Sequence, residues 1–183
     1  EVIDDVIRLP EEATEVLGLP VLASIPKFGS RRRGYNSRLI TLDNPRDPVS
    51  ERYLSLRSKL LFASSRHASK SYVFTSSGLG EGKSLTVANL AVAMAMADLN
   101  VLLIDCDLRQ PKLHQIFGLH NDLGLMALLT VEPPVLGSYE NLLDEIQEFN
   151  ECVQEPVKGL RVLTSGEIPS KPAEILGSVA LQR

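Results

Sequence analysis

The chain has 183 residues, of which 44% are hydrophobic and 23% are charged, and its net charge is −4. This is enough for one α/β domain with a core, and the acidic balance argues against a chain-wide nucleic-acid-binding surface, so we expect no nucleic-acid partner. The two cysteines, Cys106 and Cys152, match no metal or redox spacing and indicate a reducing compartment. No apolar stretch is long enough to cross a bilayer of roughly 30 Å.

The first 48 residues are expected to form a linker. Pro10, two following glutamates and Gly18 predict a short helix over 10–17, and residues 20–26 read as extended. Residues 29–48 are first basic and then rich in proline and aspartate, without apolar periodicity, which is typical of a linker.

A strand–helix–strand unit is predicted after a first helix. Apolar residues at helical spacing predict a helix over 50–63, with Ser50 as its cap. The run SYVFTSS, residues 71–77, predicts a strand. Residues 84–99 predict a buried helix that stops at Asn100. The run VLLID, residues 101–105, predicts a strand that is buried on both faces. This order gives a right-handed βαβ unit.

The rest of the chain continues the α/β pattern. Short helices are expected over 111–118 and 124–130, and an amphipathic helix over 138–153 with Leu142, Ile146, Phe149 and Val153 on one face. A third strand is expected over 159–166 and a further helix from Lys171. We therefore predict a three-layer α/β fold of the P-loop NTPase type, with a mostly parallel sheet that is truncated at the C-terminus. Because the chain begins at Glu1 and ends within a predicted helix, we expect it to be a fragment.

A glycine-rich segment, TSSGLGEGKS, joins the predicted strand to the buried helix at residues 75–84. Strand, glycine-rich turn, Lys-Ser and helix is the Walker A arrangement, in which backbone N–H groups converge on phosphate oxygens. The helix that follows adds the positive end of its dipole. Ser77 stands where the first glycine of the full motif belongs. A flexible surface loop is the alternative, but it would not need Gly-Lys-Ser at a helix start.

The loop predicts a nucleotide site for ATP and Mg²⁺. Lys83 is expected to reach the β- and γ-phosphates, and the Ser84 hydroxyl is expected to ligate the metal. The predicted nucleotide-binding residues are Ser77, Gly78, Gly80, Glu81, Gly82, Lys83, Ser84, Leu85 and Arg109.

A second motif, VLLIDCDLRQP, places Asp105 and Asp107 at the end of the next strand, where alternation sends both side chains the same way. Ligands bind at such strand ends in open α/β sheets. Two carboxylates there suit Mg²⁺ coordination and activation of an attacking hydroxyl, so Lys83, Asp105 and Asp107 are the predicted catalytic residues, and Ser84 and Asp105 the metal ligands. Taken alone, the aspartates would be read as capping the helix at Pro111, but the neighbouring P-loop favours the metal site.

Residues 75–119 resemble the Walker A and Walker A′ region of bacterial tyrosine kinases, which regulate capsule and exopolysaccharide export. EVLGLPVLASIPK resembles that family's segment between membrane domain and kinase domain, and LRVLTSGEIPSKPAEILGS resembles a later part of the kinase. The resemblance implies an ATP-dependent tyrosine kinase that autophosphorylates and regulates polysaccharide chain length. It assigns residues 49–183 to an incomplete kinase domain.

The resemblance also implies partners and a location. These are a chain-length-determinant membrane domain upstream of Glu1 or on a separate chain, other copies of the kinase for phosphorylation in trans, and a cognate phosphatase, all at the cytoplasmic face of the bacterial plasma membrane. Glu51 and Arg57 match the family's self-association motif, whereas Leu54 replaces its middle arginine. The family's Walker B strand and tyrosine cluster would follow Arg183.

Partition- and septum-site ATPases are the alternative family branch, acting as nucleotide-gated switches through DNA or membrane partners. These proteins carry a signature lysine five residues before the loop lysine, where this sequence has Gly78. That difference favours the kinase branch.

Overall fold

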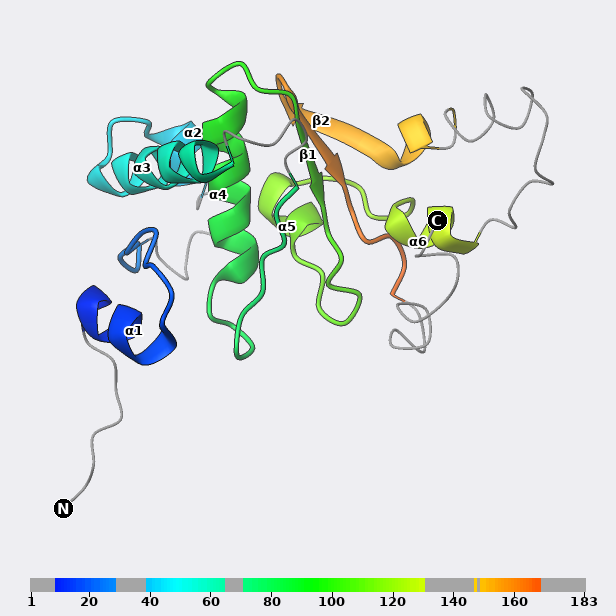
Figure 1. Ribbon diagram of the computed structural model, residues 1–183. Coiled ribbons are helices and arrows are strands. Elements are labelled where there is room, and N and C mark those ends of the chain that lie inside the picture. Colours follow the sequence, from blue (N-terminus) through cyan, green and yellow to red (C-terminus); the bar gives the residue numbers. More distant parts are fainter. Residues whose placement is uncertain (1–8, 29–38, 65–70, 131–146, 148, 169–183) are drawn as a thin grey trace.

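The computed structural model describes residues 9–28, 39–64, 71–130, 147 and 149–168 (Figure 1). Two helices lie in the N-terminal part, α1 (Pro10–Leu17) and α2 (Ile40–Asp43), followed by α3 (Pro48–Ala63) and α4 (Lys83–Ala95). After these come β1 (Val101–Ile104), α5 (Leu113–Phe117), α6 (Leu125–Thr130), β2 (Val153–Val157) and β3 (Leu160–Leu163). This mixture of helices and an open sheet confirms the predicted α/β class.

The described sheet has three strands in the order β1-β3-β2. β1 and β3 are parallel, with Val101 opposite Leu160, whereas β2 and β3 are antiparallel and are joined by a tight turn at Gly159, whose φ is 81°. The parallel pair brings the C-terminal ends of β1 and β3 to one edge of the sheet. This edge carries the residues that follow Ile104, including both aspartates of the second motif.

The core lies between one face of the sheet and helices α4 and α5. α4 is buried from Ala88 to Ala95, and its small side chains let it pack closely against the strands. On the opposite face of the sheet, α6 packs against Leu163 of β3, but Leu102 and Ile104 of β1 are exposed. The expectation that β1 is buried on both faces therefore fails within the described residues.

Helices α2 and α3 hold the other side of α4 (Figure 1). Tyr53 of α3 is fully buried against α4, and its ring meets Phe28 edge-on at a centroid distance of 6.2 Å. Arg57 donates from Nη1 to the Ala93 carbonyl at 2.6 Å. Arg57, predicted as half of a self-association motif, thus makes a contact within the chain, while Glu51 is exposed.

Within the expected linker, residues 40–43 form a helix, α2, that packs against α3 and α4. Leu39, just before the helix, is buried in the main core cluster. Four residues are too few to show apolar periodicity, so this helix has no signal in the sequence. The domain boundary at residue 48 stays a prediction.

Residues 71–76 do not form the predicted strand. Their exposure alternates as in a strand, with Tyr72 and Phe74 turned inward and Val73 outward, but their backbone bonds to no neighbouring strand among the described residues. Extended backbone becomes a strand only when a partner satisfies its N–H and C=O groups. The predicted βαβ unit therefore lacks its first strand.

Three further expectations are corrected at element ends. The left-handed residue after α4 is Asp98, with a φ of 57°, not Asn100. α3 begins at Pro48 with Asp47 as its cap, whereas Ser50 is buried and its hydroxyl donates toward the carbonyls of Ile40 and Asn44. Val153 starts β2 instead of ending an amphipathic helix.

Other expectations match the structure or lie beyond it. α1 spans residues 10–17 and stops at Gly18, α6 and β3 occur where expected, and α5 ends at Gly118. Leu142, Ile146 and the helix expected from Lys171 lie outside the described residues. No helix in the part of the chain that the structure describes is long and apolar enough to span a membrane.

The cap of α3 can be tested by substitution. The Asp47 side chain accepts a hydrogen bond from the Val49 N–H at 2.8 Å. We expect Asp47→Ala to lower the free energy of unfolding by about 0.5–2 kcal/mol, whereas Asp47→Asn retains the acceptor and stays near wild type. Urea denaturation measures both. Equal losses in the two variants would contradict the assignment of this cap.

Candidate functional site

The glycine-rich loop ends in two residues with left-handed backbone. The φ angles of Gly80 and Gly82 are 77° and 90°, a region that residues with a Cβ rarely adopt. Gly82 is the N-cap of α4, and no side chain caps the helix there. The loop thus turns the first N–H groups of α4 outward, where they and the positive end of the helix dipole can hold an anion.

Other donors of the loop already hold an anionic group, the carboxylate of Glu81. Glu81 Oε1 accepts a hydrogen bond from Ser77 Oγ at 2.9 Å. The pKa of Glu81 is lowered, chiefly by a hydrogen bond from the Gly78 backbone and next by the Ser77 side chain. The side chain is fully exposed, so an arriving phosphate can displace it. The donors of the loop therefore fit the oxygens of a phosphate group.

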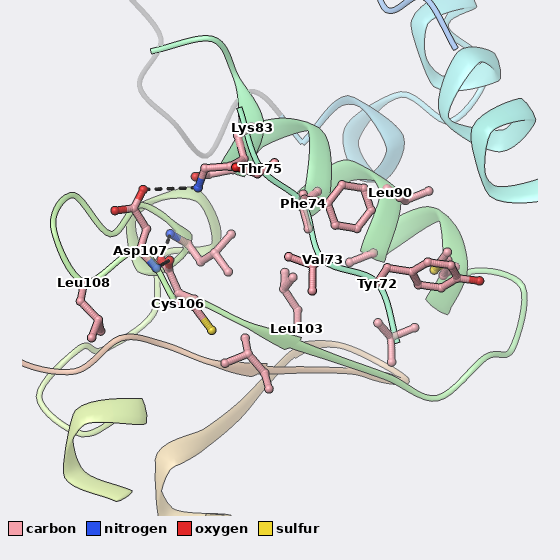
Figure 2. Close-up of a pocket in the computed structure, with 18 of the residues that line it drawn as sticks. Tyr72, Val73, Phe74, Thr75, Lys83, Leu90, Leu103, Cys106, Asp107 and Leu108 are labelled. Carbon is pink, nitrogen blue, oxygen red and sulfur yellow. Dashed lines mark hydrogen bonds and ion pairs between the residues drawn. The ribbon is translucent and has the colours of Figure 1, made fainter. Parts of the chain in front are cut away.

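Lys83, the first residue of α4, forms an ion pair with Asp107, with Nζ 3.3 Å from Oδ2 (Figure 2). Partial burial works to raise the pKa of Asp107, but hydrogen bonds from the Gln110 N–H and from Lys83, together with the Lys83 charge, outweigh it and lower that pKa. Asp107 is therefore ionised at neutral pH. The ammonium group lies at the mouth of the loop, where it can meet a second anion.

Asp105 has a different environment from Asp107. It is 4% exposed; its Oδ1 accepts from the Asp107 N–H, and its Oδ2 accepts from the N–H groups of Lys112 and Leu113 at 3.0 Å. Asp105 therefore holds the turn after β1 and caps the start of α5, as the alternative interpretation expected. Because β1 ends at Ile104, strand alternation does not apply to the two aspartates, although both line the same cavity.

One cavity of about 860 Å³ joins the two motifs (Figure 2). Five predicted site residues line its polar end: Lys83, Ser84, Asp105, Asp107 and Arg109. Leu85 is partly buried on α4 and packs against the main core cluster, outside the cavity lining. Ser77, Gly78, Gly80, Glu81 and Gly82 are exposed on the loop above it. The structure thus brings the loop lysine and serine to the same space as both aspartates.

The cavity continues as an apolar slot between residues 72–75 and β1. Its floor is the face of α4 that carries Val87, Leu90 and Met94. The sequence reasoning missed these lining residues, because an Ala-rich buried helix gives no sign of which face borders a cavity. Cys106 also lines the slot and is in part exposed to solvent. Burial first and the Asp105 charge second raise the pKa of its thiol.

The donors present fit a magnesium ion held by few protein ligands. Ser84 and the carboxylates offer oxygen atoms, the ligand type that Mg²⁺ prefers, and this ion keeps several waters beside one or two carboxylates. Within the described ranges, no three His, Cys, Asp or Glu side chains are placed to hold a metal ion. A dedicated all-protein metal cage is thus not found in this part of the chain.

A sequence model of the CobQ/CobB/MinD/ParA nucleotide-binding domain matches residues 72–176, which include the loop, α4 and both aspartates. This chain belongs to that family. The fold of this chain is also similar to the crystal structure of the chimeric protein CapA2B2, with a TM-score of 0.72 and 36% sequence identity. The match covers 95% of this chain and 67% of the CapA2B2 chain.

The curated relatives of this nucleotide-binding domain include tyrosine-protein kinases. It is 40% identical over 151 residues to tyrosine-protein kinase YwqD of Bacillus subtilis, covering 80% of this chain and 58% of that protein. The putative tyrosine-protein kinase CapB of Staphylococcus aureus is 32% identical, over 81% of this chain and 60% of CapB. The chain thus spans less than two thirds of these relatives.

A solved kinase domain supports the same branch. The kinase domain of Escherichia coli tyrosine kinase ETK matches at 28% identity and a TM-score of 0.74, over 93% of this chain and 64% of that domain. The family model covers partition-type proteins too, but these relatives are named tyrosine kinases. The switch-ATPase alternative is therefore not favoured.

The ion pair at the loop predicts a pH effect. In the Lys83→Met variant, Asp107 loses a hydrogen bond and a neighbouring positive charge, so its pKa is expected to rise. A depressed carboxyl pKa stabilises the fold above the unfolded pKa, and this contribution disappears as pH falls through the folded pKa. The wild type should therefore lose more stabilisation at acidic pH than the variant, which keeps the backbone hydrogen bonds from Gln110 and Arg109 to Asp107.

Carboxyl titration by NMR measures this shift and contains its own control. Glu81 depends on Gly78 and Ser77, not on Lys83, so its titration should not move in the variant. An unchanged Asp107 titration would contradict the role assigned to the ion pair.

Proposed function

We propose that this domain binds ATP with Mg²⁺ at the glycine-rich loop and transfers the terminal phosphoryl group to tyrosine. The observation that carries the proposal is the single cavity where the uncapped start of α4, Lys83 and Asp107 meet. The sequence similarity to tyrosine-protein kinases selects phosphoryl transfer to tyrosine over ATP hydrolysis alone.

Each residue at the polar end has a proposed part. The loop N–H groups and Lys83 hold the β- and γ-phosphates, and Ser84 with Asp105 holds the metal, whose charge offsets that of the phosphates. Asp107 accepts the proton of the tyrosine hydroxyl, because its carboxylate is ionised and can act as a base. Arg109 lines the same cavity and contacts phosphate oxygens. Asp105 Oδ2 accepts two backbone hydrogen bonds and Oδ1 accepts one, so Oδ1 keeps a lone pair for the metal.

The phosphorylated tyrosine lies outside this core. Tyr53 is 1% exposed, and burial raises its pKa to about 12 although its bond with Thr86 lowers it. Tyr72 is partly buried, and its hydroxyl shares a 2.6 Å hydrogen bond with Ser64 Oγ. Tyr35 and Tyr139 are outside the described residues. We propose that the acceptors belong to a tail after Arg183, presented by another copy of the protein.

The same reasoning extends to the setting of the enzyme. We propose that residues 1–48 connect the kinase to a chain-length-determinant membrane domain, on the same or a separate chain, at the cytoplasmic face of the bacterial plasma membrane. We also propose that Glu51 takes part in contacts between copies of the protein, and that a cognate phosphatase acts on it. The exposure of Glu51 on α3 is compatible with such a contact.

A phosphorylation assay tests the proposed activity. The full-length protein is incubated with Mg²⁺ and γ-labelled ATP, and phosphotyrosine and released phosphate are measured together. We expect Lys83→Met to lower phosphotyrosine formation by about 100-fold or more, since it removes a cation aimed at the transferred group. Lys158→Met, on the turn between β2 and β3, is the matched control and should keep wild-type activity. Released phosphate without phosphotyrosine in the wild type would contradict kinase function.

A further inference from the structure

A buried polar contact joins helix α2 to the helix that follows the phosphate loop. Thr41 of α2 and Asn89 of α4 are 1% and 0% exposed. The Thr41 N–H donates to Asn89 Oδ1 at 3.1 Å, and the Thr41 hydroxyl lies 3.0 Å from Asn89 Oδ1 and 3.1 Å from the Asn89 carbonyl. We call this pair the polar lock.

The lock acts close to the phosphate loop. Asn89 Nδ2 donates to the carbonyl of Leu85, one turn nearer the start of α4 and next to Ser84. On the neighbouring side of the helix, Tyr53 of α3 is hydrogen-bonded with Thr86. The first turns of α4 are therefore tied to α2 and α3 by side-chain hydrogen bonds, and farther along the helix Arg57 of α3 donates to the Ala93 carbonyl.

Apolar packing alone would fix the position of α4 poorly. Its buried face is built mainly of alanines, which offer shallow ridges, so a small slide or rotation would cost little contact area. A buried polar pair has a different effect, because any displacement leaves buried donors and acceptors unpaired. One buried asparagine can set the register of packed helices for this reason.

We propose that Thr41 and Asn89 are positioning residues for the phosphate loop, so that nucleotide affinity depends on how α2 is seated against α4. The inference rests on the proposed nucleotide site. α2 belongs to the segment expected to link the kinase to a membrane partner, and Leu39 beside it is held in the main core. A displacement of that segment would reach the loop through the lock, so the lock couples linker position to nucleotide binding.

Calorimetry of the full-length protein with ADP and Mg²⁺ tests the coupling. Thr41→Val keeps the shape of the side chain but loses the hydroxyl, and Thr41→Ser keeps the hydroxyl. Thr164→Val is the matched control: Thr164 is equally buried, and its hydroxyl donates to the Leu123 carbonyl, away from α4. Stoichiometry and dissociation constant are read separately, because a merely unstable variant binds with reduced stoichiometry at unchanged affinity.

We expect Thr41→Val to raise the dissociation constant for ADP by about fivefold or more at full stoichiometry, with Thr41→Ser close to wild type. Thr164→Val should lose thermal stability to a similar extent without any change in affinity. Equal affinities for wild type and Thr41→Val would overturn the inference, as would an equal loss in Thr164→Val. Failure of the wild type to bind ADP would instead overturn the proposed nucleotide site.

Discussion

The open N-terminus of α4 is the constraint on which the site depends. Its N–H groups can hold phosphate only if nothing in the protein caps them, and Gly82 with positive φ leaves them uncapped. An uncapped helix end costs stability, so the rest of α4 must be held firmly. The sheet, α5, α3 and α2 surround its buried part, and Arg57 satisfies the Ala93 carbonyl near its C-terminal end. The fold thus stabilises a helix whose one exposed end is kept free for a ligand.

Parts of this arrangement follow from local sequence chemistry. The loop from Gly78 to Ser84 is predicted by its glycines followed by Lys-Ser. Gly118 predicts the end of α5, because few other residues adopt the left-handed backbone conformation found there. Lys83 and Asp107 lie far apart in the sequence, and no sequence motif predicts that they pair. Each residue is predicted separately, from its own motif. The division of work between Asp105 and Asp107 depends on β1 ending at Ile104, one residue earlier than the apolar run indicates.

Other parts could not be predicted because they depend on tertiary neighbours. α2 exists because Thr41 and Leu39 find buried partners in α4, and β2 contains Pro156, a residue that argues against a strand unless an edge position tolerates it. Residues 71–76 have strand-like alternation but lie across the apolar slot from β1, with no described strand between them.

Amide NMR with ADP and Mg²⁺ tests most directly whether the loop is a phosphate site. The account predicts saturable shifts at Gly80, Gly82, Lys83 and Ser84. Gly118 and Gly159, which share positive φ but lie in turns outside the cavity, should not move. Shifts that saturate elsewhere while the loop amides stay unchanged would contradict the account.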